Sequence, residues 1–328
     1  MSVFSKDFTI DPRRIRVLRE VAQRGTVTGA AAGLHLTPSA VSQQIAALSR
    51  DLGVPLLEKT GRGVRLTGQA QVILQHASVV QAQFERARAD LAAFADGARG
   101  SVAVAGFSTA ISGLIAPAMQ LLSQRRPGIA VTAVEMDPPE VFTRLDRGEL
   151  DVVVAVDHRG VPPHTDPHYH RQPLLADRFE VGLPVGHPFA ARDSIELSEL
   201  AGETFVAAAP QSSCAEVTLA ACAAAGFTPD IRHYSSDWSA VASLVAVGCG
   251  VALVPRLAQP VVVEGFLLRP LAGVGAARNI FAAVRAGAQD DPVLAVTLQV
   301  LCEVAHGLAE LRASARKPVT GRLQPVEQ

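Results

Sequence analysis

Four histidines lie close together in a proline-rich segment of the chain: His158, His164, His168 and His170. Imidazole side chains at short spacing could bind a transition metal ion. Three prolines bend this segment, and no cysteine lies near it to complete a ligand set. We therefore expect no metal site here.

The chain contains four cysteines that could do thiol chemistry: Cys214, Cys222, Cys249 and Cys302. Their uneven spacing fits neither a disulfide framework nor a zinc site, so we expect buried, reduced thiols. The sequence has no GxSxG elbow, phosphate loop or zincin pattern that would place a nucleophile beside a base. We therefore expect neither an enzyme nor a cofactor.

The elements that precede these residues predict a helix-turn-helix. Residues 12–24 place apolar side chains at helical spacing, with Pro12 in the first turn and Gly25 at the end. Thr28 is expected to cap a second short helix. Thr37 and Pro38 then supply the cap and first position of a third helix, which ends near Gly53.

A hairpin and a long helix follow. The segments LLEKT and VRLT flank the glycine-bounded basic tip GRG, a pattern that predicts a wing. From Gln69 to about Ala98 the chain can form one helix, because no proline interrupts it. Apolar residues recur along this helix with the period of a coiled-coil seam, which predicts a helical dimer interface: Ile73, Ala77, Val80, Phe84, Ala87, Leu91 and Phe94.

Beyond Gly100 the pattern changes to α/β. Apolar segments such as VAVAGF and DVVVAV alternate with helical segments around 111–124 and 139–147. A second such set runs from RFEVGLPV to GVALVP and includes helices near 214–225 and 239–247. The two sets predict two lobes with a cleft, joined by crossovers near 158–164 and 260–266. Residues 313–328 have little apolar content, which predicts disorder.

Composition supports a soluble chain of two or three domains. The 328 residues are 48% hydrophobic and 19% charged, and no stretch contains the roughly 18 uncharged apolar residues of a membrane helix. The first 16 residues lack the pattern of a signal peptide, so we expect a cytoplasmic protein. Residues 1–66 carry a net charge of +5 and the remainder −6, which indicates a basic, polyanion-binding head on an acidic body.

One stretch resembles a known family. Residues 15–70, IRVLREVAQRGTVTGAAAGLHLTPSAVSQQIAALSRDLGVPLLEKTGRGVRLTGQA, are similar to the DNA-binding domain of bacterial LysR-type transcriptional regulators. The segments DVVVAV and LVAVGCGVALVP resemble the effector domain of that family. The resemblance implies an α/β fold plus a winged helix-turn-helix, with a dimerising linker helix and a bilobed effector domain like the type 2 periplasmic binding proteins.

The resemblance also implies domain boundaries and partners. It implies a DNA-binding domain over 1–68, a linker helix over 69–99, an effector domain over 100–314 and a tail over 315–328. Within the effector domain, we assign 100–161 and 266–314 to lobe I and 162–265 to lobe II. The implied partners are double-stranded DNA, a small-molecule effector, RNA polymerase and further copies of the chain, as a homodimer and a homotetramer. No membrane partner is expected.

Carried over residue by residue, the family's DNA contacts fall on the helix-turn-helix and the wing: Thr28, Thr37, Pro38, Ser39, Ser42, Gln43, Arg62 and Arg65. Short hydroxyls at a helix N-terminus can reach phosphates and base edges, and arginines on a wing can enter the minor groove. Many members have Arg or Lys where this chain has Gln43. A glutamine pairs with adenine rather than guanine, so the guanine preference of typical members is in question here.

The resemblance places the effector site at helix starts facing the cleft: Ser108, Thr109, Ser212, Ser213, Asp237 and Trp238. Hydroxyls and free amides at helix N-termini hold anions well, which favours a carboxylate effector. The alternative is that these residues are ordinary helix caps. Asp237 would oppose an anion, so a neutral or amine-bearing effector stays open.

A redox-sensing regulator of the same architecture is a second interpretation. Cys214 and Cys222 lie near the places where peroxide-sensing members of the family carry a reactive pair. Activation of a thiol requires a positive neighbour, and the local sequence around Cys214 has none.

Overall fold

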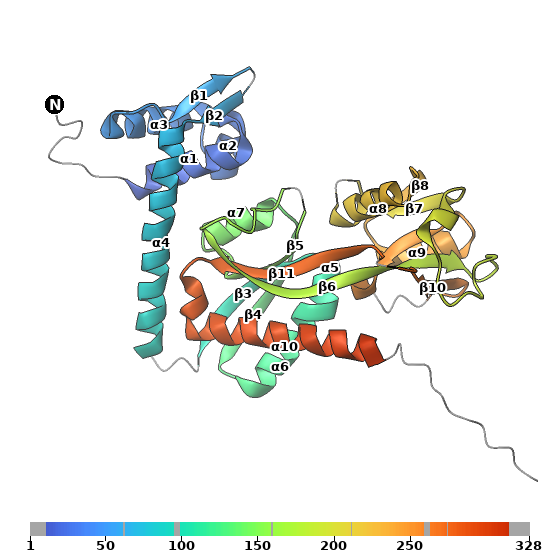
Figure 1. Cartoon of the computed structure of the whole chain (residues 1–328). Helices are drawn as coiled ribbons and strands as arrows, with labels where there is room; N and C mark the ends of the chain where they lie inside the picture. Colours follow the sequence, from blue (N-terminus) through green and yellow to red (C-terminus); the bar gives the residue numbers. More distant parts are fainter. Residues whose placement is uncertain are drawn as a thin grey trace, which may run out of the picture. The chain divides into compact units, whose positions relative to one another are not determined.

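The computed structural model describes residues 11–61, 63–94, 99–158, 160–210, 212–258, 263–273 and 275–314 (Figure 1). The chain divides into two compact units. The first unit comprises Met1–Ala95, Thr165–His170 and Arg285–Asp291, and the second comprises Asp96–His164, Arg171–Val284 and Pro292–Gln328. The sequence predicts disorder over residues 313–328; residues 313 and 314 belong to a helix, and residues 315–328 lie outside the described residues.

The first unit begins with a winged helix-turn-helix, as predicted. Its elements are α1 (Pro12–Arg24), α2 (Val27–Leu34), α3 (Pro38–Leu52) and a hairpin of β1 (Leu57–Thr60) and β2 (Gly63–Leu66). Gly25 ends α1 because its φ of 66° is a left-handed conformation that a glycine adopts without strain. Thr37 caps α3, where its hydroxyl accepts a hydrogen bond from the amide of Ala40 at 3.2 Å.

The cap of α2 differs from the prediction. Thr26, not Thr28, occupies the capping position, and its hydroxyl accepts a hydrogen bond from the amide of Gly29 at 3.0 Å. The reason is that the chain turns at Gly25, so the next residue already has the extended backbone of a cap. Thr28 is instead an exposed residue of the first helical turn.

A compact apolar core holds this domain together. It is formed by the inward faces of the three helices and the start of the fourth, and includes Leu18, Val41, Leu48, Leu56 and Leu74. These side chains repeat at three- and four-residue intervals within each helix, which leaves the outer faces polar.

The helix α4 (Gly68–Phe94) follows the wing. Its first turns cover the core of the domain through Ala70 and Leu74, which are buried. Ile73 and Ala77, the first two predicted seam residues, are partly buried against the same core. Further along, α4 exposes large apolar side chains: Val72, Val79, Val80, Phe84 and Leu91.

The second unit contains two lobes that share the long strand β6 (Tyr169–Pro184). The first lobe is a sheet with the strand order β6-β11-β5-β3-β4. Its other strands are β3 (Gly100–Gly106), β4 (Ile129–Glu135), β5 (Val152–Val156) and β11 (Ala277–Arg285). The first three of these pair in parallel and β11 pairs antiparallel to β5.

The second lobe is built on the far half of β6. Residues 179–184 of that strand pair with β9 (Ala252–Pro255) and β10 (Phe266–Pro270). A separate parallel pair consists of β7 (Thr204–Ala208) and β8 (Asp230–Ser235). The sequence predicted that the chain returns to the first lobe at 260–266. That prediction is wrong, because β10 still pairs with the second-lobe half of β6 and the return comes after Pro270.

Helices cover both lobes. In the first lobe they are α5 (Ser108–Ala110), the π-helical turn η1 (Ile111–Ile115), α6 (Ala116–Arg125), α7 (Glu140–Asp146) and α10 (Pro292–Ser314). In the second they are η2 (Leu197–Leu200), α8 (Ser213–Ala224), α9 (Trp238–Ala246) and η3 (Arg256–Ala258). A short turn, η4 (Ala288–Asp290), belongs to the first unit.

The helix α10 is largely apolar, although it contains the charged residue Glu303. Among the described residues, Pro292–Glu310 is long and apolar enough to cross a membrane by length and composition alone. It lies beside α6 and also contacts β3 and η1 (Figure 1). Leu298, Leu301 and Ala305 are buried in these contacts, which is the pattern of a helix that covers a sheet.

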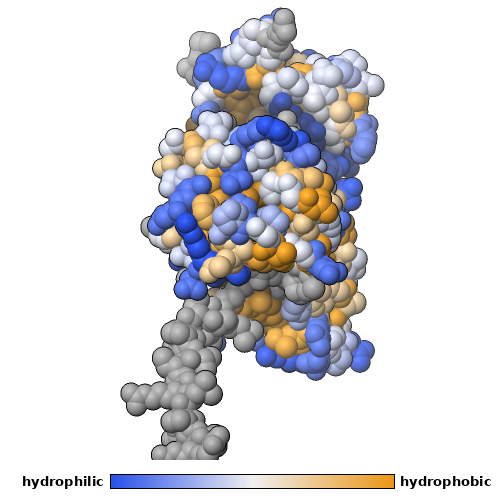
Figure 2. Space-filling model, turned by 90° about the vertical axis from the view of Figure 1, so that its right-hand side faces the viewer, coloured by the Kyte–Doolittle hydropathy of each residue, from blue (hydrophilic) through white to orange (hydrophobic). Residues whose placement is uncertain are grey.

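On the face of the molecule that Figure 2 draws, hydrophobic and hydrophilic residues are interspersed.

Candidate functional site: an interlobe cleft and a winged-helix surface

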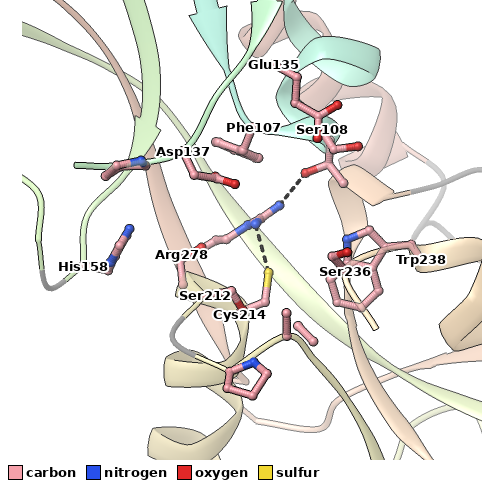
Figure 3. A pocket seen from close by; sticks show the side chains of 16 residues that line it. Phe107, Ser108, Glu135, Asp137, His158, Ser212, Cys214, Ser236, Trp238 and Arg278 are labelled. Carbon is pink, nitrogen blue, oxygen red and sulfur yellow. Dashed lines mark hydrogen bonds between the residues drawn. The ribbon is translucent and has the colours of Figure 1, made fainter. Parts of the chain in front are cut away.

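A cleft of about 300 Å³ lies between the two lobes of the second unit (Figure 3). The first lobe contributes the start of α5, the end of β4 and the residues that follow β4 and β5. The second lobe contributes the end of β7 and the starts of α8 and α9. The lining side chains include Phe107, Ser108, Thr109, Glu135, Asp137, His158, Ser212, Ser213, Cys214, Ser236, Trp238 and Arg278. A cavity of this size suits a small molecule.

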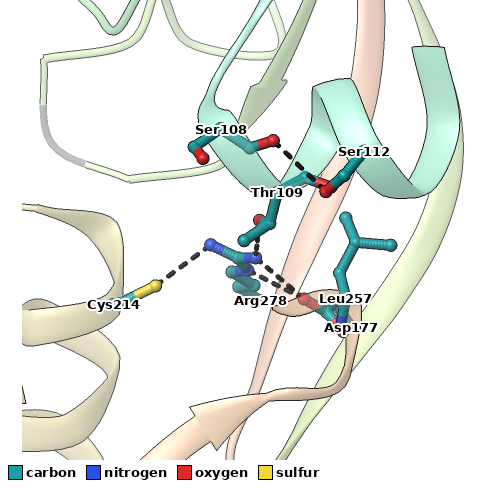
Figure 4. Close-up of polar contacts among 7 residues, drawn as sticks. All are labelled: Ser108, Thr109, Ser112, Asp177, Cys214, Leu257 and Arg278. Atoms are coloured by element: carbon teal, nitrogen blue, oxygen red, sulfur yellow. Dashed lines mark hydrogen bonds and ion pairs between the residues drawn. The ribbon is translucent and has the colours of Figure 1, made fainter. Parts of the chain in front are cut away.

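Arg278 is the central side chain of the cleft, and it is 4% exposed (Figure 4). Its Nε and Nη2 donate to Asp177 Oδ2 at 3.0 and 2.9 Å. Its Nη2 also donates to Thr109 Oγ1 at 2.9 Å, and its Nη1 donates to Cys214 Sγ at 3.0 Å. One guanidinium therefore contacts β6, the first-lobe helix α5 and the second-lobe helix α8.

Asp177 is fully buried, and its other carboxylate oxygen accepts a hydrogen bond from the amide of Leu257 at 2.9 Å. The charge of Arg278 is thus balanced inside the protein. Two aromatic rings also lie near this guanidinium: its carbon is 4.8 Å from the ring centroid of Phe107 and 5.9 Å from that of Phe179. The sequence analysis missed Arg278 and Asp177. The sequence did contain a signal for them. Each residue lies inside an apolar strand segment, Asp177 in LLADRFEV and Arg278 in AARNIFAAV, where a buried charge requires a partner.

A polar surface on the winged helix-turn-helix contains most of the predicted DNA contacts. Thr37, Pro38, Ser39, Ser42 and Gln43 are all exposed along the first two turns of α3. The hydroxyls of Thr37 and Ser39 lie 2.9 Å apart, so they form one hydrogen-bonding pair at the helix start. On the wing, Arg65 is exposed and forms an ion pair with Glu58 at 2.9 Å. Arg62 lies outside the described residues.

Comparison with protein-family models assigns both parts of the chain. Residues 12–71 match the model "Bacterial regulatory helix-turn-helix protein, lysR family", and residues 95–305 match the model "LysR substrate binding domain". The chain belongs to the LysR family. It is a DNA-binding transcriptional regulator with an effector-binding domain, and the fold predicted from the sequence is confirmed.

Individual relatives support the assignment. The chain is 28% identical over 252 residues to the transcriptional dual regulator GltC of Bacillus subtilis, and the match covers 74% of this chain and 80% of that protein. It is 27% identical over 288 residues to the transcriptional regulator MetR of Escherichia coli, and the match covers 87% of each chain. These relatives are transcriptional regulators rather than enzymes.

Solved structures share the fold of this LysR-family chain. The OxyR C206 mutant of Corynebacterium glutamicum matches with a TM-score of 0.59 at 22% identity, over 96% of this chain and 98% of that one. Full-length CbnR in complex with its target DNA matches with a TM-score of 0.55 at 23% identity, over 90% of this chain and 100% of that one.

Five of the six predicted effector residues line the cleft of this LysR-family protein, and they differ in what they do there. Ser212 lines the cavity and also caps α8, where its hydroxyl accepts a hydrogen bond from the amide of Ala215 at 3.2 Å. Thr109 is buried and holds Arg278. Asp237 is not among the lining residues, because its carboxylate caps α9 by accepting a hydrogen bond from the amide of Ser239 at 2.7 Å.

Cys214 and Cys222 of this LysR-family protein are free thiols that lie too far apart for a disulfide in this structure. Cys214 and Cys222 are both buried on α8, eight residues apart, which separates them by roughly 12 Å along a helix. A disulfide requires Cα atoms about 4.4–6.8 Å apart, so α8 would have to unwind to form one. Burial raises the pKa of Cys214 more than the neighbouring Arg278 lowers it, and burial raises the pKa of Cys222 to about 11.

Two of the clustered histidines have different surroundings. His158 lines the cleft, and its buried Nδ1 has no hydrogen-bond partner among the described residues. His168 contacts Asp166 through Nδ1 at 2.5 Å, in the first unit. Within the part of the chain that the structure describes, no three His, Cys, Asp or Glu side chains meet in a way that could hold a metal ion.

The linker helix of this LysR-family protein exposes the middle of its predicted seam. Val80, Phe84 and Leu91 are 54%, 63% and 69% exposed in the single chain, and Ala87 is also exposed. Ile73 and Ala77 are partly covered by the domain's own core, and the side chain of Phe94 lies outside the described residues. A contiguous row of exposed large apolar side chains is typical of an interface.

Proposed function

We propose that this regulator reads DNA with the exposed start of α3 and the wing, under the control of a small molecule bound in the interlobe cleft. The observation that carries the proposal is the cleft itself, where helix-start hydroxyls from both lobes and the buried Arg278 converge on one cavity. The protein acts by binding and conformational change rather than by catalysis. It works in the cytoplasm.

The DNA contacts divide by their chemistry. Thr28, Thr37 and Ser39 approach the phosphates, because short hydroxyls and helix N-terminal amides bind anions. Pro38, at the first position of α3, packs against the same backbone. Ser42 and Gln43 lie one turn further along α3 and reach base edges in the major groove. On the wing, Arg62 and Arg65 enter the adjacent minor groove.

The effector carries a carboxylate or a similar anion. The amide of Ala215 donates to the Ser212 hydroxyl, and the amides of Ser213 and Cys214 before it have no acceptor within the helix. The helix dipole adds partial positive charge at this end. Ser108, Ser212 and Ser213 offer hydroxyls to the same ligand, and Trp238 forms an apolar wall. Thr109 contributes through its contact with Arg278.

The assembly is a dimer through α4 and a tetramer of two such dimers. The exposed row at Val80, Phe84 and Leu91 is buried when two copies of α4 pair. The two DNA-binding domains of a dimer match the two half-sites of an operator with two-fold symmetry. The DNA-bound tetramer is the form that RNA polymerase contacts.

Two measurements on the full-length protein test the proposal. Selection from a randomised DNA pool should yield one motif with two-fold symmetry, and a metabolite screen by thermal shift should yield a ligand. Ser213→Trp fills the cleft and should abolish the ligand shift while DNA binding persists. Ser198→Trp, on the exposed surface of η2, serves as the control and should bind the ligand normally. A ligand that still binds Ser213→Trp with unchanged affinity would place the effector elsewhere.

A further inference from the structure

The charges that line the cleft do not cancel. Its lining contains the acidic residues Glu135 and Asp137 and the basic residue Arg278. The charge of Arg278 is already matched by Asp177, since both side chains are buried and their charged atoms lie 2.9 Å apart. Glu135 and Asp137 form no ion pair within the described residues. The described lining therefore carries unbalanced negative charge.

The backbone directs both carboxylates to the same side. Glu135 is the last residue of β4, and the amide of Met136 still donates to the carbonyl of Gly106 on β3 at 3.0 Å. Because alternate residues of an extended chain share a face, Glu135 and Asp137 project together. In Figure 3, the carboxylate of Asp137 points toward the guanidinium of Arg278, and Glu135 lies beside Ser108.

The carboxylate of Asp137 influences a thiol on the other lobe of the cleft. Cys214 lies on the opposite lobe, where burial chiefly raises the pKa of its thiol, and the carboxylate of Asp137 adds to that rise. His158 lines the cleft as well, and its buried Nδ1 lacks a hydrogen-bond partner among the described residues. A ligand group can satisfy that atom.

The opposite wall of the cleft favours a negatively charged group. It is the start of α8, a helix of 12 residues whose first-turn amides and Ser213 hydroxyl suit an anion. The cleft thus has one side that stabilises positive charge and one that stabilises negative charge, within about 300 Å³.

We infer that the effector is a small zwitterion, such as an α-amino acid, whose ammonium group binds Glu135 and Asp137 and whose carboxylate binds the start of α8. This inference rests on the proposed function, because it assigns the ligand class of the same cleft. Ammonium donors and carboxylate acceptors form charge-assisted hydrogen bonds, which are stronger than neutral ones. A simple carboxylate lacks the group that Glu135 and Asp137 require, and its charge is repelled by theirs.

The test uses the full-length protein and matched ligands. The twenty standard amino acids are screened by thermal shift, and each that binds is compared by calorimetry with its desamino acid and its decarboxylated amine. For leucine these probes are 4-methylpentanoate and 3-methylbutylamine. We expect at least one amino acid to bind, and both of its analogues to bind at least about tenfold more weakly, as the loss of a charged hydrogen bond predicts.

A double variant assigns the preference to the two carboxylates. E135Q/D137N should weaken binding of the amino acid at least about tenfold and leave the desamino acid unchanged or tighter. The control E149Q/D193N removes the same charge from exposed positions outside the cleft lining, and should bind like the wild type.

The outcomes separate this inference from the proposed function. If no amino acid binds, if the desamino acid binds equally well, or if E135Q/D137N binds the amino acid normally, the zwitterion assignment is wrong. In those cases the proposed function still holds, provided that some other ligand binds the wild type and is lost in Ser213→Trp. If Ser213→Trp retains every ligand, the cleft is not the effector site and both proposals fail.

Discussion

Arg278 and Asp177 form a buried ion pair between β11 and β6, the two strands nearest the point where the lobes join. They lie 101 residues apart in the sequence, and the pair also contacts α5, α8 and the start of η3. A charge buried this deeply persists only with its partner in place.

Asp177→Asn should destabilise the second unit by about 3–5 kcal/mol, because it removes the one carboxylate that the structure shows in contact with the buried guanidinium. Urea unfolding of the full chain, followed by a probe of each unit, measures the loss. Asp230→Asn is the matched control, since its ion pair with Arg232 is largely exposed and should be worth at most about 1 kcal/mol. Equal stability of Asp177→Asn and the wild type would contradict the importance of the pair.

The buried thiol of Cys222 makes the free energy of unfolding depend on pH in the alkaline range. Burial raises the pKa of its thiol from about 9 to about 11, so the folded state keeps a proton that the unfolded state releases. The stabilisation is complete below pH 9 and is lost as the pH rises toward 11. The expected loss is about 2–3 kcal/mol.

The measurement is the difference in unfolding free energy between wild type and Cys222→Ala, in reducing buffer from pH 7 to 11. Other titrating groups are common to both proteins and cancel. The difference should shrink above pH 9, and a constant difference would mean that Cys222 ionises normally in the fold.

Phe84→Glu should dissociate the dimer, because it places a charge at the centre of the exposed apolar row of α4. Light scattering coupled to size exclusion would detect the monomer. Gln75→Glu adds the same charge at an exposed position of the helix outside the predicted seam, and should remain dimeric. A dimeric Phe84→Glu that still protects its full operator would rule out the α4 interface.

Gln43→Arg should change the base that α3 reads. Gln43 is exposed, and Ser39, Ser42 and Gln43 lie on about one side of the helix, since three- and four-residue separations are neighbours. The substitution replaces an adenine-pairing amide by a guanine-pairing guanidinium, a discrimination of roughly 1–3 kcal/mol. Non-specific affinity should rise slightly from the added charge.

Selection from a randomised DNA pool with both proteins checks this prediction, with an adenine-to-guanine change expected at one position per half-site. Gln44→Arg is the control, because it adds the same charge at the adjacent and less exposed position. Identical motifs from the wild type and Gln43→Arg would mean that Gln43 faces a phosphate or solvent, and that DNA shape or the serines determine specificity.

Local signals in the sequence predicted the winged helix-turn-helix almost completely. Gly25, Thr37 and Gly53 end or begin helices through their own backbone conformations and through contacts within four residues. The error at Thr28 was also local, because two nearby threonines fit the capping pattern and only the position of the turn at Gly25 distinguishes them.

The sequence by itself determined the two-domain organisation, the helices and strands, and which helix starts could face a cleft, since these depend on periodicity and caps. Only the tertiary structure decided that Arg278 meets Asp177 and Cys214, residues 101 and 64 positions away. It likewise decided that β10 stays with the second lobe and that Asp237 is a cap outside the cleft lining. The physical reason is that sheet order and strand pairing bring distant residues together, and no local pattern of residue types records which strands become neighbours.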